Sequence, residues 1–244
     1  MNRPFSFLDN ILNILIIEDD PESMALIKDI LDGQTVFCIH TAVSSQEALN
    51  LLKSGKRFHI CIMDLGLSDI QNDEFFILRQ YAQHTSIIVL TGSSSPQKGA
   101  ICIKTGARGV FEKGTSLNIR EFLKAVHHNT LISIINHRYN EFNPDTINLA
   151  TKILFEKKPA SVTEWADYMK ISDRQLRNLW HNGSGFSAKY TLAIYTLFST
   201  AFSYFHALQF ESKSVVAELL NSCSETKLHT NFKQNSEIFT FLLS

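Results

Sequence analysis

The first half of the chain alternates short apolar runs with longer segments in which apolar residues recur every three or four positions. The short runs are typical of buried strands, and the periodic segments are typical of amphipathic helices. Pro21 at one helix start, and Gly33 and Gly55 at two helix ends, support the boundaries. We expect strands at 13–17, 35–42, 58–64, 86–92 and 107–114, and helices at 21–33, 44–55, 72–82, 95–106 and 116–137.

This alternation predicts a parallel sheet with helices on both faces, that is, a doubly wound α/β domain of five strands, (βα)5. The central strands are nearly continuous runs of Ile, Val and Leu, as expected where helices cover both faces of a sheet. In such sheets, ligands bind beyond the carboxyl ends of the strands. The residues that follow each strand are therefore the first place to look for a functional site.

Polar residues follow four of the predicted strands. Glu18 and Asp19 follow the first, Asp64 follows the third, Thr91 ends the fourth and Lys113 ends the fifth. Clustered carboxylates repel one another, and we expect a hard divalent cation, Mg²⁺, to bind their oxygens. A lysine and a hydroxyl opposite complete a site shaped for phosphate, in which Asp64 is the nucleophile and becomes phosphorylated. The alternative is that these are strand-end polar residues with no joint role.

With these residues in place, residues 12–136 resemble the receiver domain of bacterial two-component response regulators. The segments ILIIEDD, CIMDLGLSD, IIVLTG and VFEKG match its four motifs in order and spacing. The resemblance implies a sensor histidine kinase as partner and Mg²⁺ as cofactor. It implies Asp64 as phosphoacceptor and Thr91 and Lys113 as switch residues. It places Glu18, Asp19, Asp64 and the Gly66 carbonyl at the metal, with Asp19 a direct ligand and Asp20 either a spectator or a residue that supports the ligands from behind.

Three positions depart from the receiver pattern. Gly114 follows the lysine where the family usually has proline, and Ser68 replaces the usual proline four residues after the phosphoacceptor. Val110 stands where the family has an aromatic switch residue, and the neighbouring Phe111 should face the other side of its strand. The residues for phosphorylation are all present, so we expect the chemistry to be intact and the coupling of an aromatic switch to Thr91 to be altered.

The second half of the chain reads as all-helical after a polar linker at 137–145. Asn143-Pro144 marks this linker, and a helix at 147–158 should stop at Pro159. A helix capped by Ser161 or Thr163, a tight turn and a helix capped by Ser172 form a helix-turn-helix pattern. Its second helix should bury Leu176, Leu179 and Trp180 and expose Arg174, Gln175, Arg177 and Asn178.

Residues 146–244 resemble, in degenerate form, the DNA-binding domain of AraC-type regulators. The first helix-turn-helix unit is matched by Ala166, Ser172, Leu176, Trp180, Gly185 and Ser187, and the second by Ala217, Ser224, Thr226, Leu228, Phe232 and Lys233. Asn221-Ser222 replaces the usual Gly-Phe, and Thr230 and Tyr195-Thr196 replace arginine and Arg-Leu. The resemblance implies DNA contacts from Arg174, Gln175, Arg177, Asn178, Lys227 and Lys233, with the second unit weakened by its lost charge.

Charge leaves two output functions open. The whole chain has a net charge of -1, and residues 145–244 carry 10 Lys and Arg against 9 Asp and Glu. The second half therefore lacks the strong positive net charge that is typical of DNA-binding domains. We expect a response regulator that controls transcription and is not an enzyme, since it catalyses only its own phosphorylation and dephosphorylation. The alternatives are a phosphorylated adaptor whose helical domain binds protein, and a receiver that works without phosphorylation.

The remaining features favour a cytoplasmic protein. Cys38, Cys61, Cys102 and Cys223 form no CxxC pair and read as reduced thiols, the nine histidines lack metal-ligand spacing, and the N-terminus lacks the apolar core of a signal peptide. Residues 190–210 contain no charged residue, but small polar residues interrupt them, so we expect a buried helix and no membrane contact. This helix should pack against the receiver, the helix-turn-helix units or a second copy in a homodimer.

Overall fold

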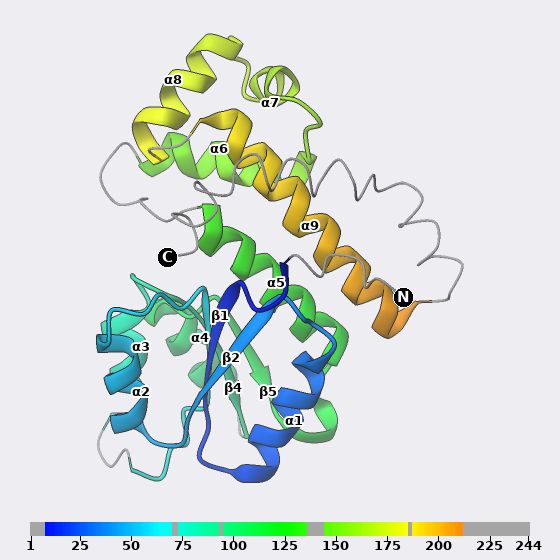
Figure 1. Ribbon diagram of the computed structural model, residues 1–244. Coiled ribbons are helices and arrows are strands. Elements are labelled where there is room, and N and C mark those ends of the chain that lie inside the picture. The colour runs from blue at the N-terminus through cyan, green and yellow to red at the C-terminus, as the bar shows by residue number, and fades with distance from the viewer. Residues whose placement is uncertain (1–7, 70–72, 93–94, 136–143, 185–186, 212–244) are drawn as a thin grey trace. The chain divides into compact units, whose positions relative to one another are not determined.

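The computed structural model describes residues 8–69, 73–92, 95–135, 144–184 and 187–211, and its chain divides into two compact units (Figure 1). The first unit, called the receiver unit below after the resemblance in its sequence, comprises the residues up to Ser133 together with the described residues from Ala201 onward. The helical unit comprises Ile134–Thr200. The first unit is therefore built from two separate stretches of sequence.

The receiver unit contains the predicted five-stranded parallel sheet, which confirms the α/β fold class. The strand order is β2-β1-β3-β4-β5, so the order reverses at β1, and β1 and β3 lie side by side. Hydrophobic side chains of β1, β3 and β4 are almost completely buried, as their Ile, Val and Leu content predicts. The strands are β1 (Leu12–Ile17), β2 (Phe37–Ala42), β3 (Ile60–Met63), β4 (Ser86–Thr91) and β5 (Gly109–Glu112).

Within the described residues up to Ile135, helices α2, α3 and α4 cover one face of the sheet, and α1 and α5 cover the other (Figure 1). Side chains of Asp20, Ser44 and Ser95 accept backbone hydrogen bonds at the starts of α1, α2 and α4, which explains why those boundaries match the sequence. Helix α3 is shorter than the predicted 72–82, because Phe75 precedes it without a side-chain cap. The helices are α1 (Pro21–Asp32), α2 (Ser45–Lys53), α3 (Phe76–Tyr81), α4 (Pro96–Thr105) and α5 (Ile119–Ile135), with a 3-10 turn at Gly114–Ser116.

The helical unit packs around two tryptophans. Trp165 and Trp180 are both fully buried, with ring centroids 4.7 Å apart, and each indole N–H has a partner: the Ala150 carbonyl at 3.0 Å and the Thr191 hydroxyl at 2.7 Å. Leu176 is buried beside them as predicted, whereas Leu179 is only half-buried. The elements are α6 (Pro144–Lys157), α7 (Val162–Tyr168), α8 (Asp173–Ser184) and α9 (Ala188–Phe210).

Helix α6 begins earlier than expected. Its first residue is Pro144, which the sequence analysis assigned to the linker 137–145, because proline is also well suited to a first helical turn, where an N–H is not needed. The predicted stop at Pro159 is correct, and Lys158 ends the helix with a left-handed φ of 48°. The predicted N-caps Ser161 and Ser172 are both present, accepting from the backbone of Glu164 and Gln175.

The uncharged helix α9 is divided between the two units. Its first part lies in the helical unit, where Tyr195 packs edge-on against Phe155, and its part from Ala201 lies in the receiver unit. Of the three packing partners expected for this helix, the structure shows the receiver and the first helix-turn-helix unit. Among the described residues, no helix is long and apolar enough to span a membrane. The predicted second helix-turn-helix unit, with Lys227 and Lys233, and Cys223 lie outside the described residues.

Candidate functional site: the phosphoacceptor pocket

Backbone hydrogen bonds at the ends of the strands hold the candidate site residues in register. The Glu18 N–H donates to the Ala42 carbonyl at 3.0 Å, beyond β1 and β2. The Asp64 N–H donates to the Ile17 carbonyl at 2.9 Å, and the Lys113 N–H donates to the Thr91 carbonyl at 2.9 Å. The parallel sheet thus brings these residues, far apart in the chain, to one edge, as the sequence pattern predicted.

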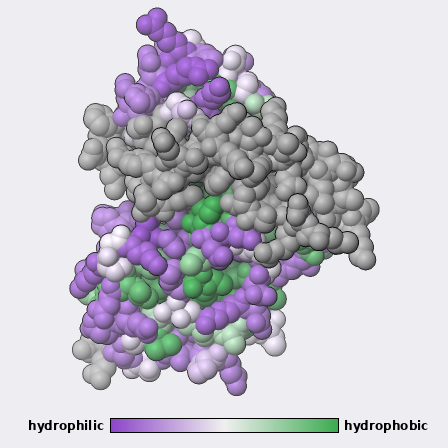
Figure 2. Space-filling view, viewed as in Figure 1, coloured by the Kyte–Doolittle hydropathy of each residue, from purple (hydrophilic) through white to green (hydrophobic). Residues whose placement is uncertain are grey.

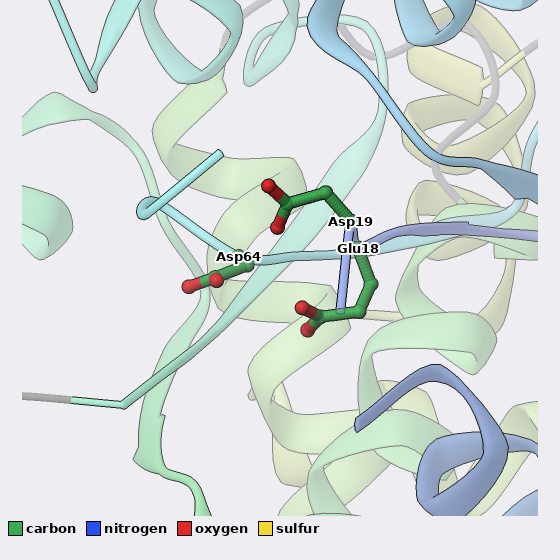
Figure 3. A group of neighbouring side chains, drawn as sticks. All are labelled: Glu18, Asp19 and Asp64. Atoms are coloured by element: carbon green, nitrogen blue, oxygen red, sulfur yellow. The ribbon is translucent and has the colours of Figure 1, made fainter. Parts of the chain in front are cut away.

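Three carboxylates meet at this edge. Oxygen atoms of Glu18, Asp19 and Asp64 lie within 4.8 Å of one another, and Figure 3 shows the three side chains gathered together. Lys113 faces the same group, with its Nζ 2.5 Å from Glu18 Oε2 and 2.8 Å from Asp64 Oδ2. One ammonium group cannot neutralise three carboxylates, so the cluster retains negative charge that a cation would balance.

Burial sets the electrostatics of the pair formed by Glu18 and Lys113. The Glu18 side chain is fully buried, and this burial raises its pKa above the usual range, against the opposing effect of Lys113. Burial alone would lower the pKa of Lys113, but hydrogen bonds to Asp64 and Glu18 outweigh it and raise that pKa. Lys113 is therefore a fixed positive charge beside Asp64 at neutral pH.

The residues present fit a magnesium ion. Asp64 Oδ1 is buried and has no hydrogen-bond partner among the described residues, which leaves one oxygen of the predicted phosphoacceptor available. The donor set consists of carboxylate oxygens with the predicted Gly66 carbonyl, and hard oxygen donors are what Mg²⁺ prefers. Glu18, Asp19, Asp64 and Gly66 are thus the residues that would hold the ion.

Asp19 makes a contact that depends on one of the departures from the family pattern. The backbone N–H of Ser68 donates to Asp19 Oδ2 at 2.8 Å, a bond that the usual proline could not make. Although slight burial opposes the effect, hydrogen bonds with Ser68 lower the pKa of Asp19. Asp20, read as a spectator, caps α1 through Ser23 and donates its own N–H to Glu18 Oε1 at 3.2 Å.

The cluster opens into a pocket of about 520 Å³. The pocket includes the predicted Asp64, Gly66, Thr91 and Lys113, which brings together the proposed nucleophile and both switch residues. Sequence reasoning missed Lys98 in the first turn of α4, which lies next to the pocket and pairs with Glu74 at 2.7 Å. Its signal was its position in the first turn of the helix that follows β4, close to the same sheet edge. The lining residues are Ser23, Asp64, Gly66, Thr91, Gly92, Lys98, Lys113 and Gly114.

The aromatic switch position is occupied by a smaller side chain that packs toward α2, α3 and α4. Val110 is half-buried against the core cluster that includes Val89 and Cys102. Phe111 faces the other side of β5, where its ring meets Phe122 of α5 edge-on at 5.4 Å. This confirms that Phe111 cannot take the place of an aromatic residue at position 110, because alternate residues of a strand point to opposite faces.

Comparison with known proteins identifies this part of the chain. Residues 14–127 match the family model of the response regulator receiver domain. Similar solved structures include a response regulator receiver domain from Clostridium thermocellum (23% identity, covering 49% of this chain and 94% of that chain, TM-score 0.43). A second is a CheY-like receiver domain from Methanospirillum hungatei JF-1 (21% identity, covering 50% of this chain and 95% of that chain, TM-score 0.44). A third is the receiver domain of a putative Luxo repressor from Vibrio parahaemolyticus (20% identity, covering 54% of this chain and 98% of that chain, TM-score 0.46). No curated protein matches the chain.

The matched segment contains the carboxylate cluster, Thr91 and Lys113. Residues 14–127 are therefore a response regulator receiver domain, the module that two-component systems use as a phosphoacceptor. This confirms the receiver part of the resemblance found in the sequence. The matched segment ends at residue 127, so the AraC-like resemblance of residues 146–244 stays a prediction.

Magnesium should stabilise the receiver unit through this site. At a Mg²⁺ concentration ten times the dissociation constant, we expect the free energy of unfolding to rise by about 1.4 kcal/mol. The reason is that the ion binds the carboxylate cluster of the folded state and not the separated carboxylates of the unfolded chain. Calorimetric or circular-dichroism melting, with and without a chelator, measures the shift. The shift should vanish in Asp19→Asn and persist in the neighbouring Asp20→Asn; an equal shift in both variants would place the ion elsewhere.

Proposed function

We propose that this chain is the response regulator of a two-component phosphorelay, phosphorylated on Asp64 by a sensor histidine kinase in the cytoplasm. The observation that carries the proposal is the arrangement around Asp64: one free buried oxygen, two neighbouring carboxylates, and Lys113 within 2.8 Å of the other oxygen. A structural salt bridge would need no open pocket and no third carboxylate.

The residues suit an in-line phosphoryl transfer. A carboxylate oxygen of Asp64 forms a bond to phosphorus as the phosphorus–nitrogen bond of the kinase phosphohistidine breaks, and the imidazole leaves with that electron pair. Lys113 and Thr91, which line the same pocket, are placed to bind the phosphoryl oxygens. Bound Mg²⁺ supplies neutralisation of the phosphoryl charge. Water later hydrolyses the acyl phosphate, so the receiver turns over no external metabolite.

For the helical unit we propose an AraC-like output that controls transcription. Arg174, Gln175 and Asn178 are exposed on α8, the second helix of the first helix-turn-helix unit. In Figure 2 the visible surface of this unit, at the top of the view, is mainly hydrophilic. Phosphorylation would shift the population between two states of the receiver. This shift would change how readily the helical unit, alone or in a homodimer, binds DNA.

A specific contact favours the second candidate, a phosphorylated adaptor that binds protein. Arg177 forms a two-pronged ion pair with Asp173 one turn earlier on α8, with one nitrogen 3.2 Å from Asp173 Oδ2. The Asp173 carboxylate also accepts from the Thr163 hydroxyl at 3.1 Å, which ties the pair to α7. Arg177 is thus partly neutralised within the chain, and Arg174 becomes the main candidate for phosphate contact on α8.

Capture of genomic DNA separates the two candidates. The full chain, with and without a small acyl phosphate, is incubated with sheared genomic DNA near physiological salt, and retained fragments are sequenced. We expect discrete fragments that are lost in Arg174→Ala, with binding weakened about 10-fold and a salt dependence reduced by about one ion. Asp173→Ala should strengthen non-specific binding by freeing Arg177, and Lys152→Ala, at an exposed position of α6, is the matched control. No retention at any salt, in either phosphorylation state, would favour the adaptor.

A further inference from the structure

The part of α9 that belongs to the receiver unit inserts an aromatic ring beside a buried histidine of α5. The rings of Phe202 and His127 are stacked, with centroids 4.4 Å apart and planes 8° apart. Phe37, at the start of the edge strand β2, stacks on Phe202 at 5.9 Å. His127 and Phe202 are both less than a tenth exposed, so this three-ring contact excludes water.

Polar contacts hold the same segment at both ends of the stack. His127 Nε2 lies 2.8 Å from Gln34 Oε1, and the Gln34 amide donates in turn to Gln209 Oε1 at 3.4 Å. Further along α9, an Arg120 nitrogen donates to the Phe210 carbonyl at 3.2 Å, and the same nitrogen is 3.2 Å from Glu211 Oε1. A guanidinium at the last carbonyls of a helix is favourable, because that end carries partial negative charge.

The charges around the stack favour a neutral His127. Burial, and then the nearby His206 of α9, lower the pKa of His127 to about 3. Burial, Arg120 and Lys124 lower the pKa of His206, while Glu211 and Glu121 oppose them. The groups that face His127 are the Gln34 amide, the rings of Phe37 and Phe202, and His206; among the described residues, no carboxylate is in hydrogen-bond contact with it.

We propose that Gln34, Phe37, Arg120 and His127 form a docking surface on the receiver whose ligand is residues 201–211 of the same chain, and that a proton taken up by His127 releases this segment. The surface is separate from the Asp64 pocket, and the proposal does not depend on phosphorylation. The docked segment covers the aromatic surface of α5 and β2, so its release would expose Phe37, His127 and Phe202 together.

The direction of the pH effect follows from which state binds the proton. Once undocked, His127 regains an ordinary pKa near 6.5, so protons bind the undocked state and docking is full only above that value. Between pH 7.5 and pH 5 the docking equilibrium constant should fall about 30-fold from His127 alone. Protonation of His206 would act in the same direction, because its pKa is also lowered in the docked state.

Hydrogen exchange of the full chain, corrected for the intrinsic pH dependence of exchange, tests this proposal. Amides of residues 201–211 should lose protection about 30-fold between pH 7.5 and pH 5, while α1 and β1 keep theirs. His127→Phe keeps the ring stack without the titration and should reduce the loss to a few-fold, and exposed His84→Gln is the control. If circular dichroism shows that His127→Phe does not fold, His127→Gln is used in its place as the variant without a titrating side chain. Unchanged protection in the parent chain, an equal loss in the His127 variant, or loss across the whole receiver would each overturn the proposal.

Discussion

Replacing Asp64 with asparagine should abolish phosphorylation of the chain. The amide oxygen of asparagine is not a nucleophile toward phosphorus. Among the described residues that line the pocket, Asp64 is the one carboxylate, and Glu18, the other carboxylate beside Lys113, is fully buried outside that lining. Incubated with a small acyl phosphate and Mg²⁺, the parent chain should gain the mass of one phosphoryl group, and Asp64→Asn should gain none. Intact-mass spectrometry measures both species directly.

Two controls make this result specific to the acyl phosphate. Asp20→Asn removes a carboxylate next to the same site, but Asp20 is an exposed cap of α1, so this variant should still be phosphorylated. Hydroxylamine should remove the added group, as it cleaves acyl phosphates. A parent chain that takes up no phosphoryl group would support a receiver that works without phosphorylation; uptake by Asp64→Asn would place the acceptor at another residue.

Truncating Trp180 to alanine should destabilise the helical unit by about 4 kcal/mol. The side chain is fully buried against Trp165, and its removal leaves a large cavity and a Thr191 hydroxyl without its 2.7 Å partner. The chain has two tryptophans, both in this unit, so the fluorescence of Trp165 in the variant reports unfolding of the helical unit alone. Denaturant titration followed at that residue gives the change in free energy.

Arg174→Ala is the matched control, because Arg174 is exposed on the same helix and its loss should change the stability by less than about 0.5 kcal/mol. Phosphorylation of Asp64 should persist in Trp180→Ala, since the receiver unit has its own core. A change below about 1 kcal/mol for Trp180→Ala would mean that the tryptophan pair is not the centre of the helical unit.

The cluster of carboxylates at the sheet edge could be predicted from sequence because topology alone determines where strand ends meet. Asp19, Asp64 and Lys113 each follow a strand recognisable by its apolar run, and parallel strands place their carboxyl ends together. Lys98 was missed because it reaches the pocket from a helix, and the local sequence pattern does not determine how that helix is oriented relative to the sheet. The start of α6 was missed because Pro144 fits both a linker and a first helical turn.

The partner of α9 was beyond sequence reasoning for a different reason. An uncharged helix indicates burial, but its composition does not say which surface covers it, and three surfaces were open. The contacts that decide it, such as Phe202 with His127 and Arg120 with Phe210, join residues about 75 to 90 positions apart. Such long-range pairs depend on how whole units pack, which a local hydrophobic pattern does not contain.

The discontinuous receiver unit has a consequence for synthesis of the chain on the ribosome. Its sheet and all but the last two residues of α5 are complete by Ser133, but the segment that covers Phe37 and His127 begins at Ala201, after the whole helical unit. At roughly 5–20 residues per second, these aromatic side chains stay uncovered for several seconds while residues 134–200 are made. The nascent receiver therefore passes through a stage in which this aromatic surface is not yet covered by the later part of its own chain, and association with other chains or with chaperones is favoured during that interval.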